Sequence, residues 1–230
     1  MTGLWGVRPR WRTDVLGDFF CPGCGGDRNY RRQHGRRWLR LLGAAVLPLG
    51  PVVRSAQCTT CHGRYGVESL DQPTCVRLGG MLRDAQYTVA LALLAAGGTA
   101  HRAAREAACA AVREAGFDDC GEAQVLAALA ALSGLGGELH DAHDLESPSG
   151  HGLGEAGALA VELHAVLEPL APHLAHHGRE RLLLQGAAIA LADGRYLPQE
   201  REALAVVGRC LDLPQARVGA LLEAATRASY

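Results

Sequence analysis

The spacing of hydrophobic residues along the chain changes character near residue 79. Before this point, short β-type hydrophobic runs lie among glycines, prolines and arginines, whereas after it alanine and leucine recur at helical spacing. The pattern predicts a small β-type module over residues 19–70, preceded by an arginine- and tryptophan-rich lead over residues 1–18. It predicts an all-α domain over residues 79–228.

The second part of the chain carries boundary residues for about seven helices. The capping and breaking residues expected at helix ends are Thr99, Gly116, Asp119, Pro198 and Pro214. A stretch rich in Gly, Ser, His and Asp over residues 133–152 predicts a mobile loop. The segment Leu94–Gly97 aligns with Leu191–Gly194 at an offset of 97 residues, so we expect two degenerate helical halves.

Composition adds a division of charge to this picture. The chain has 230 residues, of which 48% are hydrophobic and 20% charged, and this argues against disorder throughout. Its net charge of −1 combines 12 arginines and 5 acidic residues in residues 1–77, or +7, with 11 arginines and 19 acidic residues in residues 78–230, or −8. Opposite charge in the two parts favours two modules rather than one.

Two features bear on the compartment. The longest apolar stretch, residues 41–53, has 13 residues and contains two prolines, fewer than the roughly 20 apolar residues of a membrane-spanning helix. The first twelve residues contain no apolar run of signal-peptide length. We therefore expect a cytoplasmic protein without a membrane span, whose eight cysteines serve as metal ligands or free thiols rather than disulfides.

The cysteines of the first part form two C-x-x-C motifs with 33 residues between them. Zn²⁺ prefers four thiolate or imidazole ligands in a tetrahedral arrangement, and each motif places two sulfurs on one side of the ion. Glycine after the second cysteine of a motif lets the backbone turn there. The spacing predicts a Zn(Cys)4 zinc ribbon whose ligands are Cys21, Cys24, Cys58 and Cys61.

Three alternatives for these cysteines stay open. Cys58-x-x-Cys61-His62 also matches the c-type haem attachment pattern, although haem would leave the first motif unexplained. A thioredoxin-like redox role for Cys21 and Cys24 lacks the surrounding βαβ pattern, and unliganded structural thiols are the third alternative. Because four thiolates leave no coordination position for an activated water, we expect the zinc to be structural and His62 not to be a ligand.

Arginines and aromatic residues crowd the segment between the two motifs. Arginine with interleaved aromatic side chains suits phosphate contacts and base stacking, which makes this segment a candidate anion or nucleic-acid surface. The alternatives are a solvated hairpin whose arginines meet the acidic second part, and contact with an anionic membrane surface. The candidate contact residues are Arg31, Arg32, Arg36, Arg37 and Trp38.

An acidic element joins two of the expected helices near the end of the chain. Asp193 and Gly194, followed by Glu200, match the later half of an EF-hand loop. Ile189 and Leu191 stand where the earlier oxygen ligands would be, so a true EF-hand is excluded. Asp193 and Glu200 form either a weak divalent-cation site or ordinary helix punctuation, in which Gly194 ends one helix and Glu200 lies in the first turn of the next.

The same run carries a resemblance to a known family. Residues 182–222, with Ala-Asp-Gly followed by Glu-Arg-Glu-Ala-Leu, resemble the TerB-like family of tellurite-resistance proteins, and the similarity extends over residues 79–228. The segment Phe19–Cys24, taken with Val46–Gly50, resembles the zinc ribbon often fused to such domains. The resemblance implies an all-helical, metal-associated domain in a cytoplasmic stress-response system with no established enzymatic activity.

The family's acidic metal-associated positions correspond here to Asp193 and Glu200, while Ala96 and Ala103 occupy the equivalent positions of the first repeat. The sequence shows no Ser-His-Asp, Cys-His or phosphate-loop arrangement. We therefore expect a non-enzymatic, metal-associated binding or scaffold protein with a structural zinc ribbon and unidentified protein partners. The alternative is a zinc-ribbon regulator that binds nucleic acid.

Overall fold

The computed structural model describes residues 5–41, 44–138 and 151–229. The chain divides into two compact units, Met1–Gly79 and Gly80–Tyr230, which we call the sheet unit and the helical unit. The sheet unit holds a small antiparallel sheet with four clustered cysteines, and seven α-helices follow it among the described residues. This arrangement confirms the predicted fold class.

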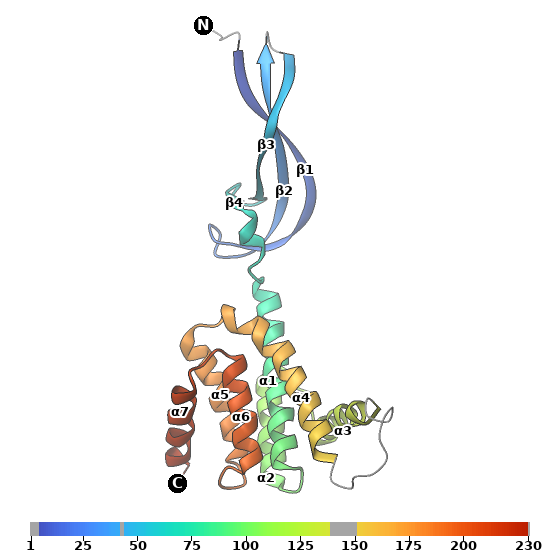
Figure 1. Ribbon diagram of the computed structural model, residues 1–230, viewed down its shortest axis with the longest axis vertical. Helices are drawn as coiled ribbons and strands as arrows, with labels where there is room; N and C mark the ends of the chain where they lie inside the picture. The colour runs from blue at the N-terminus through green and yellow to red at the C-terminus, as the bar shows by residue number, and fades with distance from the viewer. Residues whose placement is uncertain (1–4, 42–43, 139–150, 230) are drawn as a thin grey trace. The chain divides into compact units, whose positions relative to one another are not determined.

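The sheet is antiparallel throughout, in the order β1-β2-β3-β4 (Figure 1). Its strands are β1 (Trp5–Cys21), β2 (Gly26–Leu41), β3 (Ala44–Cys58) and the short β4 (Arg64–Gly66), followed by the 3-10 turn η1 (Val67–Leu70). β1 begins at Trp5, so most of residues 1–18 belong to the sheet instead of forming a separate lead. The physical reason is the alternation of arginine with less polar residues over 7–12, which has the period of a strand.

A small aromatic core lies at the end of the sheet that carries the C-x-x-C motifs. Phe19 is buried together with Cys21 and Cys58, and Tyr30 and Tyr65 pack against them. The ring centroid of Phe19 lies 5.6 Å from that of Tyr30 and 5.9 Å from that of Tyr65, in edge-on and tilted arrangements that aromatic pairs favour. Through these contacts, aromatic side chains of β1, β2 and β4 pack against one another beside the cysteines.

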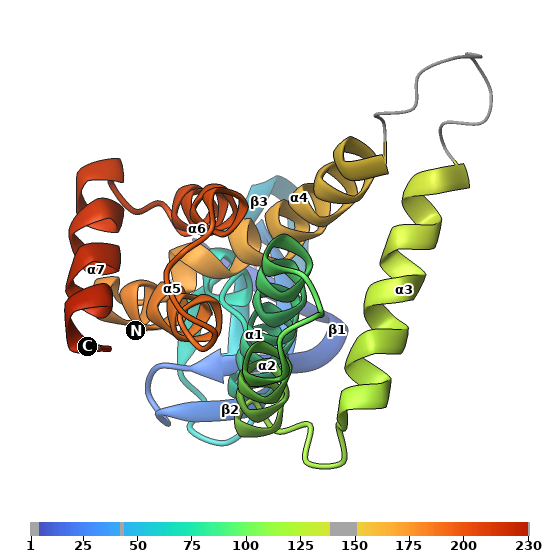
Figure 2. The same cartoon turned by 90° about the horizontal axis from the view of Figure 1, so that it is seen from below.

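The helices of the helical unit lie against one another (Figure 2), and their facing sides bury apolar residues. Its elements are α1 (Cys75–Gly97, which begins in the sheet unit), α2 (Arg102–Glu114), α3 (Glu122–Glu138), α4 (His151–Leu170), η2 (Ala171–His173), α5 (His176–Ala190), α6 (Pro198–Cys210) and α7 (Gln215–Ala228). Gly186 of α5 allows close packing, since a Cβ there would lie 2.9 Å from Val89 of α1 and 3.3 Å from Leu204 of α6. None of the described helices is both long and apolar enough to cross a membrane.

The expected helix boundaries agree with the structure in part. Pro198 is the first residue of α6, as predicted, whereas Pro214 precedes the first residue of α7 by one position. Thr99 does not cap α2, whose N-cap residue is His101. The helix α3 extends to Glu138, so the first six residues of the predicted loop 133–152 are helical, and residues 139–150 lie outside the described part of the chain.

Candidate metal centre

Each C-x-x-C motif forms a tight turn at the end of a strand. In the first turn the Gly25 N–H donates to the Cys21 carbonyl at 2.9 Å, and in the second the His62 N–H donates to the Cys58 carbonyl at 3.1 Å. Both turns place the residue after the second cysteine in the left-handed region, with φ of 66° at Gly25 and 59° at His62. The two motifs therefore share one backbone design, with glycine supplying this conformation in the first and histidine in the second.

The four cysteine sulfurs converge on a single point between the two turns. All four Sγ atoms lie within 4.8 Å of one another, with Cys21 Sγ 3.7 Å from Cys61 Sγ and Cys24 Sγ 3.9 Å from Cys58 Sγ. Four sulfurs placed tetrahedrally at about 2.3 Å from zinc would be separated by about 3.8 Å. The donor set and these two separations therefore fit a zinc ion, and both contacts join one motif to the other.

The protonation of the cluster also favours a cation at its centre. Burial raises the pKa of Cys21, but hydrogen bonds from Tyr65, the Cys24 backbone and the neighbouring thiols outweigh it and lower the pKa to about 6. Burial and the thiols of Cys61, Cys21 and Cys58 raise the pKa of Cys24 to about 12. One thiolate thus opposes ionisation of another in the metal-free cluster, and a divalent cation would remove this conflict.

Tyr65 is a functional residue that the sequence reasoning missed. Its hydroxyl lies 3.5 Å from Cys21 Sγ and 3.8 Å from Cys61 Sγ, so that one phenol contacts a sulfur from each motif. The glycines Gly23 and Gly63 leave room for it, because a Cβ at either position would meet the Tyr65 hydroxyl. Outer residues of this kind orient metal ligands and tune their basicity. The sequence marks this contact only indirectly, through glycines in both motifs.

The remaining cysteines lie apart from this cluster. Cys109 and Cys210 are buried, and burial raises the pKa of both thiols. Cys210 Sγ lies 3.4 Å from His164 Nδ1, and the same nitrogen lies 2.8 Å from Glu168 Oε1. A nucleophilic relay needs the thiol and the carboxylate on different ring nitrogens. The observed geometry therefore does not form a Cys-His-Glu relay.

Glu200 caps a helix. Its side chain is 1% exposed, and its Oε2 accepts a hydrogen bond from the Leu197 N–H at 2.7 Å at the start of α6. Burial raises the pKa of Glu200, and the charge of the half-buried Asp193 raises it further. Within the described residues, only the four-cysteine cluster brings three or more metal-ligating side chains together, so Asp193 and Glu200 gain no third ligand there. Their divalent-cation site stays a prediction.

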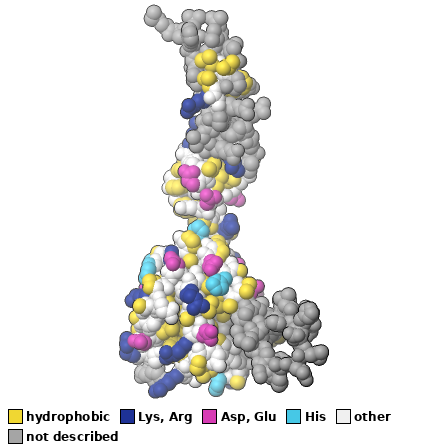
Figure 3. Space-filling model, in the orientation of Figure 1, with side chains coloured by type: hydrophobic (Ala, Val, Ile, Leu, Met, Phe, Trp, Pro, Cys, Tyr) yellow, Lys and Arg dark blue, Asp and Glu magenta, His cyan; other side chains and the backbone are white. Residues whose placement is uncertain are grey.

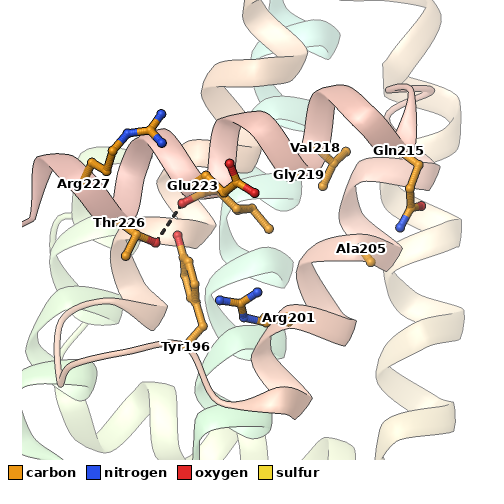
Figure 4. A pocket seen from close by; sticks show the side chains of 10 residues that line it. Tyr196, Arg201, Ala205, Gln215, Val218, Gly219, Glu223, Thr226 and Arg227 are labelled. Carbon is orange, nitrogen blue, oxygen red and sulfur yellow. Dashed lines mark hydrogen bonds between the residues drawn. The ribbon is translucent and has the colours of Figure 1, made fainter.

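A pocket of about 390 Å³ lies between α6 and α7 of the helical unit (Figure 4). Arg201 lies over the ring of Tyr196, 5.5 Å from its centroid, and burial raises the pKa of the Tyr196 phenol. Thr226 of α7 lies beside the Tyr196 hydroxyl and lowers the pKa of the phenol, although burial has the larger effect (Figure 4). The lining combines Arg201 and Arg227 with Glu223, and this mixed charge does not by itself select a class of ligand.

The candidate basic residues do not form one surface. Successive positions of a strand face opposite sides of a sheet, so Arg32, Arg36 and Trp38 share one face of β2 while Arg31 and Arg37 share the other. The β1–β2 register also pairs three arginines of β1 with β2, and the prediction did not include these three. The pairs across β1 and β2 are Arg8 with Trp38, Arg10 with Arg36, and Arg12 with His34. The sequence pattern that indicates these positions is the arginine at every second residue over 8–12, which is the spacing of a strand.

On the helical unit, by contrast, basic and acidic side chains are interspersed over the visible face (Figure 3). Several are paired, such as Arg217 with Glu180 at 2.6 Å and Arg179 with Asp212 at 3.2 Å. Mixed and paired charge of this kind is typical of an ordinary solvated surface.

Comparison with known proteins adds no relative to this description. No match was found among models of protein families, among curated proteins or among solved structures.

Proposed function

We propose that this chain is a non-enzymatic, metal-associated binding or scaffold protein whose β-sheet is held together at one end by a structural Zn(Cys)4 centre. The observation that carries the proposal is the convergence of four sulfurs, from two sequence-distant motifs, to within 4.8 Å of one another. Thiolates at this separation match the ligand type and tetrahedral geometry of structural zinc.

A structural role follows from the ligand count and from the small size of the surrounding core. Four thiolates complete the tetrahedron and leave no open position at which water or substrate would bind. Among the described residues, the hydrophobic cluster around the sulfurs has Phe19, Cys21 and Cys58 as its only buried members. Because so little apolar surface is buried there, metal binding would supply folding free energy that the core does not.

The helical unit has a less defined role in this proposal. Its TerB-like character rests on the residues of the run 182–222 and stays a prediction, as does a role in tellurite resistance or another stress response. Helix α6 is capped at its start, and a partly polar pocket lies beside Tyr196. A pocket of this kind suits the binding of a partner more than a chemical reaction.

Metal analysis of the purified full chain tests the proposal. We expect one zinc per chain, lost in Cys24→Ser, and four thiols that react with a thiol reagent only after a chelator is added. The matched control is Cys75→Ser, which changes an exposed cysteine of the same unit and should retain the zinc. A wild-type chain without zinc, or equal loss of zinc in both variants, would contradict the proposal.

A further inference from the structure

The pocket between α6 and α7 has a charged end and an apolar end. Arg201 lies one helical turn before Ala205 on α6, and Glu223 lies one turn after Gly219 on α7. All four residues line the pocket, and Figure 4 shows the two charged residues toward the end that holds Tyr196 and the two small residues toward the other end. Its volume of about 390 Å³ suits a small molecule.

Gly219 leaves the apolar end open. A glycine inside a helix lowers the stability of that helix relative to alanine, so its presence there calls for a reason. Gly208 of α6 has a packing reason, because a Cβ there would lie 2.5 Å from Val218 Cγ2. A Cβ at Gly219 would meet no atom of the described residues within 4 Å, its own helix backbone and chain neighbours apart. Close packing therefore explains Gly208 but not Gly219, whose missing side chain leaves space in the pocket.

The charged end holds groups of both signs. The Arg201 guanidinium lies 5.5 Å from the ring centroid of Tyr196, and this cation–π contact holds it at the pocket. Glu223 comes from the other helix, and Arg227 adds a second guanidinium beside it. Within the described part of the chain, none of the three charged side chains forms an ion pair. The pocket therefore offers a guanidinium to a carboxylate and a carboxylate to an ammonium group.

We propose that this pocket binds a free α-amino acid with an apolar side chain. Its carboxylate would contact Arg201, its ammonium group Glu223, and its side chain would fill the space beside Ala205 and Gly219. The inference rests on the binding role proposed for the helical unit and names the ligand class of that pocket.

Charge complementarity is the reason for a ligand that carries both charges. An apolar anion would pair with Arg201 but would shield Glu223 from water without giving it a partner, and an apolar amine would do the reverse. An α-amino acid pairs with both groups, and burial of its apolar side chain adds to the affinity.

Isothermal titration calorimetry of the full chain with three matched probes tests the proposal. The probes are L-phenylalanine, 3-phenylpropionate, which lacks the ammonium group, and 2-phenylethylamine, which lacks the carboxylate. We expect phenylalanine to bind and each of the other two to bind at least about tenfold more weakly, because each leaves one charged group of the pocket without a partner. Each preparation is also assayed for zinc, so that the state of the four-cysteine cluster is known separately.

Gly219→Leu fills the pocket from its own wall. The new side chain has room, and leucine favours a helix more than glycine does, so the variant should fold at least as stably as the wild type. It should weaken phenylalanine binding by about tenfold or more, because the apolar end is occupied. The matched control is Gly79→Leu, which changes an exposed glycine of α1 that also has open space around it and does not line the pocket. Its affinity should equal that of the wild type.

Two charge variants assign the two ends of the ligand. Glu223→Gln should weaken phenylalanine binding by about tenfold and should not weaken binding of 3-phenylpropionate, which has no ammonium group. Arg201→Gln should weaken phenylalanine binding similarly and should not weaken binding of 2-phenylethylamine. Arg209→Gln is the control, because it removes an exposed arginine of α6 that does not line the pocket.

Three results would overturn the inference: no saturable binding of phenylalanine by the zinc-loaded chain up to about 10 mM, equal affinity for phenylalanine and 3-phenylpropionate, or equal weakening by Gly219→Leu and Gly79→Leu. A chain that lacks zinc and still binds phenylalanine with the expected pattern would instead contradict the proposed zinc centre and leave the inference standing.

Discussion

The sheet unit and the helical unit bury apolar side chains on different scales. Among the side chains that the structure describes, four hydrophobic residues are buried in the sheet unit and 31 in the helical unit. Two of the four, Cys21 and Cys58, belong to the four-cysteine cluster. Among the described residues, the helices are held by hydrophobic burial, whereas the end of the sheet that carries the C-x-x-C motifs buries few apolar side chains besides two of the cysteines, so a metal cross-link would add stability there.

The largest expected effect is the response of the two units to metal removal. A chelator should abolish hydrogen-exchange protection in β1 to β4 and leave that of α5 and α6 almost unchanged, because only the sheet depends on the four thiolates. Mass-spectrometric hydrogen exchange, resolved by peptide, measures both responses in one sample.

The converse variant is Leu183→Ala, which truncates a fully buried side chain of α5 and should cost about 3 kcal/mol of unfolding free energy in the helical unit with zinc retained. Simultaneous loss of protection in both units after chelation would contradict the claim that only the sheet unit depends on the metal.

A smaller effect is expected at the contact between Tyr65 and the sulfurs. Gly23→Ala places a methyl group against the Tyr65 hydroxyl and should weaken zinc binding by about tenfold, measured by competition with a chromogenic chelator. Tyr65→Phe removes the hydroxyl and its contacts with Cys21 and Cys61, with a loss of similar size.

The double variant Gly23→Ala/Tyr65→Phe should bind zinc no more weakly than Tyr65→Phe alone, because the atom that the new methyl group meets is gone. Additive losses in the double variant would show that Gly23 acts through something other than Tyr65.

In the helical unit, the buried Glu200 should make stability depend on pH. Since burial raises its pKa in the folded state, folding favours the protonated form, and the unfolding free energy should decrease as pH rises from the ordinary value of 4.5 through the raised pKa. Glu200→Gln should remove this decrease while its side-chain oxygen still accepts the Leu197 N–H. Urea unfolding at a series of pH values measures the difference, and identical pH profiles for both proteins would refute the assignment.

The smallest effect is expected at His62. A non-glycine residue in the left-handed conformation is strained by about 1 kcal/mol, and His62→Gly relieves this strain at some cost in chain entropy. Zinc affinity should therefore change less than about threefold, in contrast to Gly23→Ala. A large loss of zinc from His62→Gly would indicate that the imidazole is itself a ligand.

The four-cysteine cluster was predictable because its members are local pairs. The spacing within each C-x-x-C motif places its two sulfurs on the same side, and the structure brings all four sulfurs together as the spacing predicts. Tyr65 could not be predicted in the same way, since its contact with Cys21 depends on β4 pairing beside β3. The helices of the second part were predictable from their periodicity, although the end of α3 was not, because glycine and serine near its end resemble a loop.

The long strands were the largest difference from the prediction. Over residues 8–12 three arginines alternate with one proline and one tryptophan, and from sequence alone residues 1–18 are interpreted as a lead rather than as a strand. Pairing with β2 gives these backbone groups partners that sequence alone does not reveal. Once residues 26–41 are known to form a strand, the alternation of its positions separates Arg31 and Arg37 from Arg32, Arg36 and Trp38.

X-ray absorption at the zinc edge of the purified chain tests the central claim most directly. The account predicts one zinc per chain with four sulfur ligands at about 2.3 Å and no nitrogen or oxygen in the first shell. Absence of zinc, or a shell in which nitrogen or oxygen replaces a cysteine of Cys21, Cys24, Cys58 and Cys61, would contradict it.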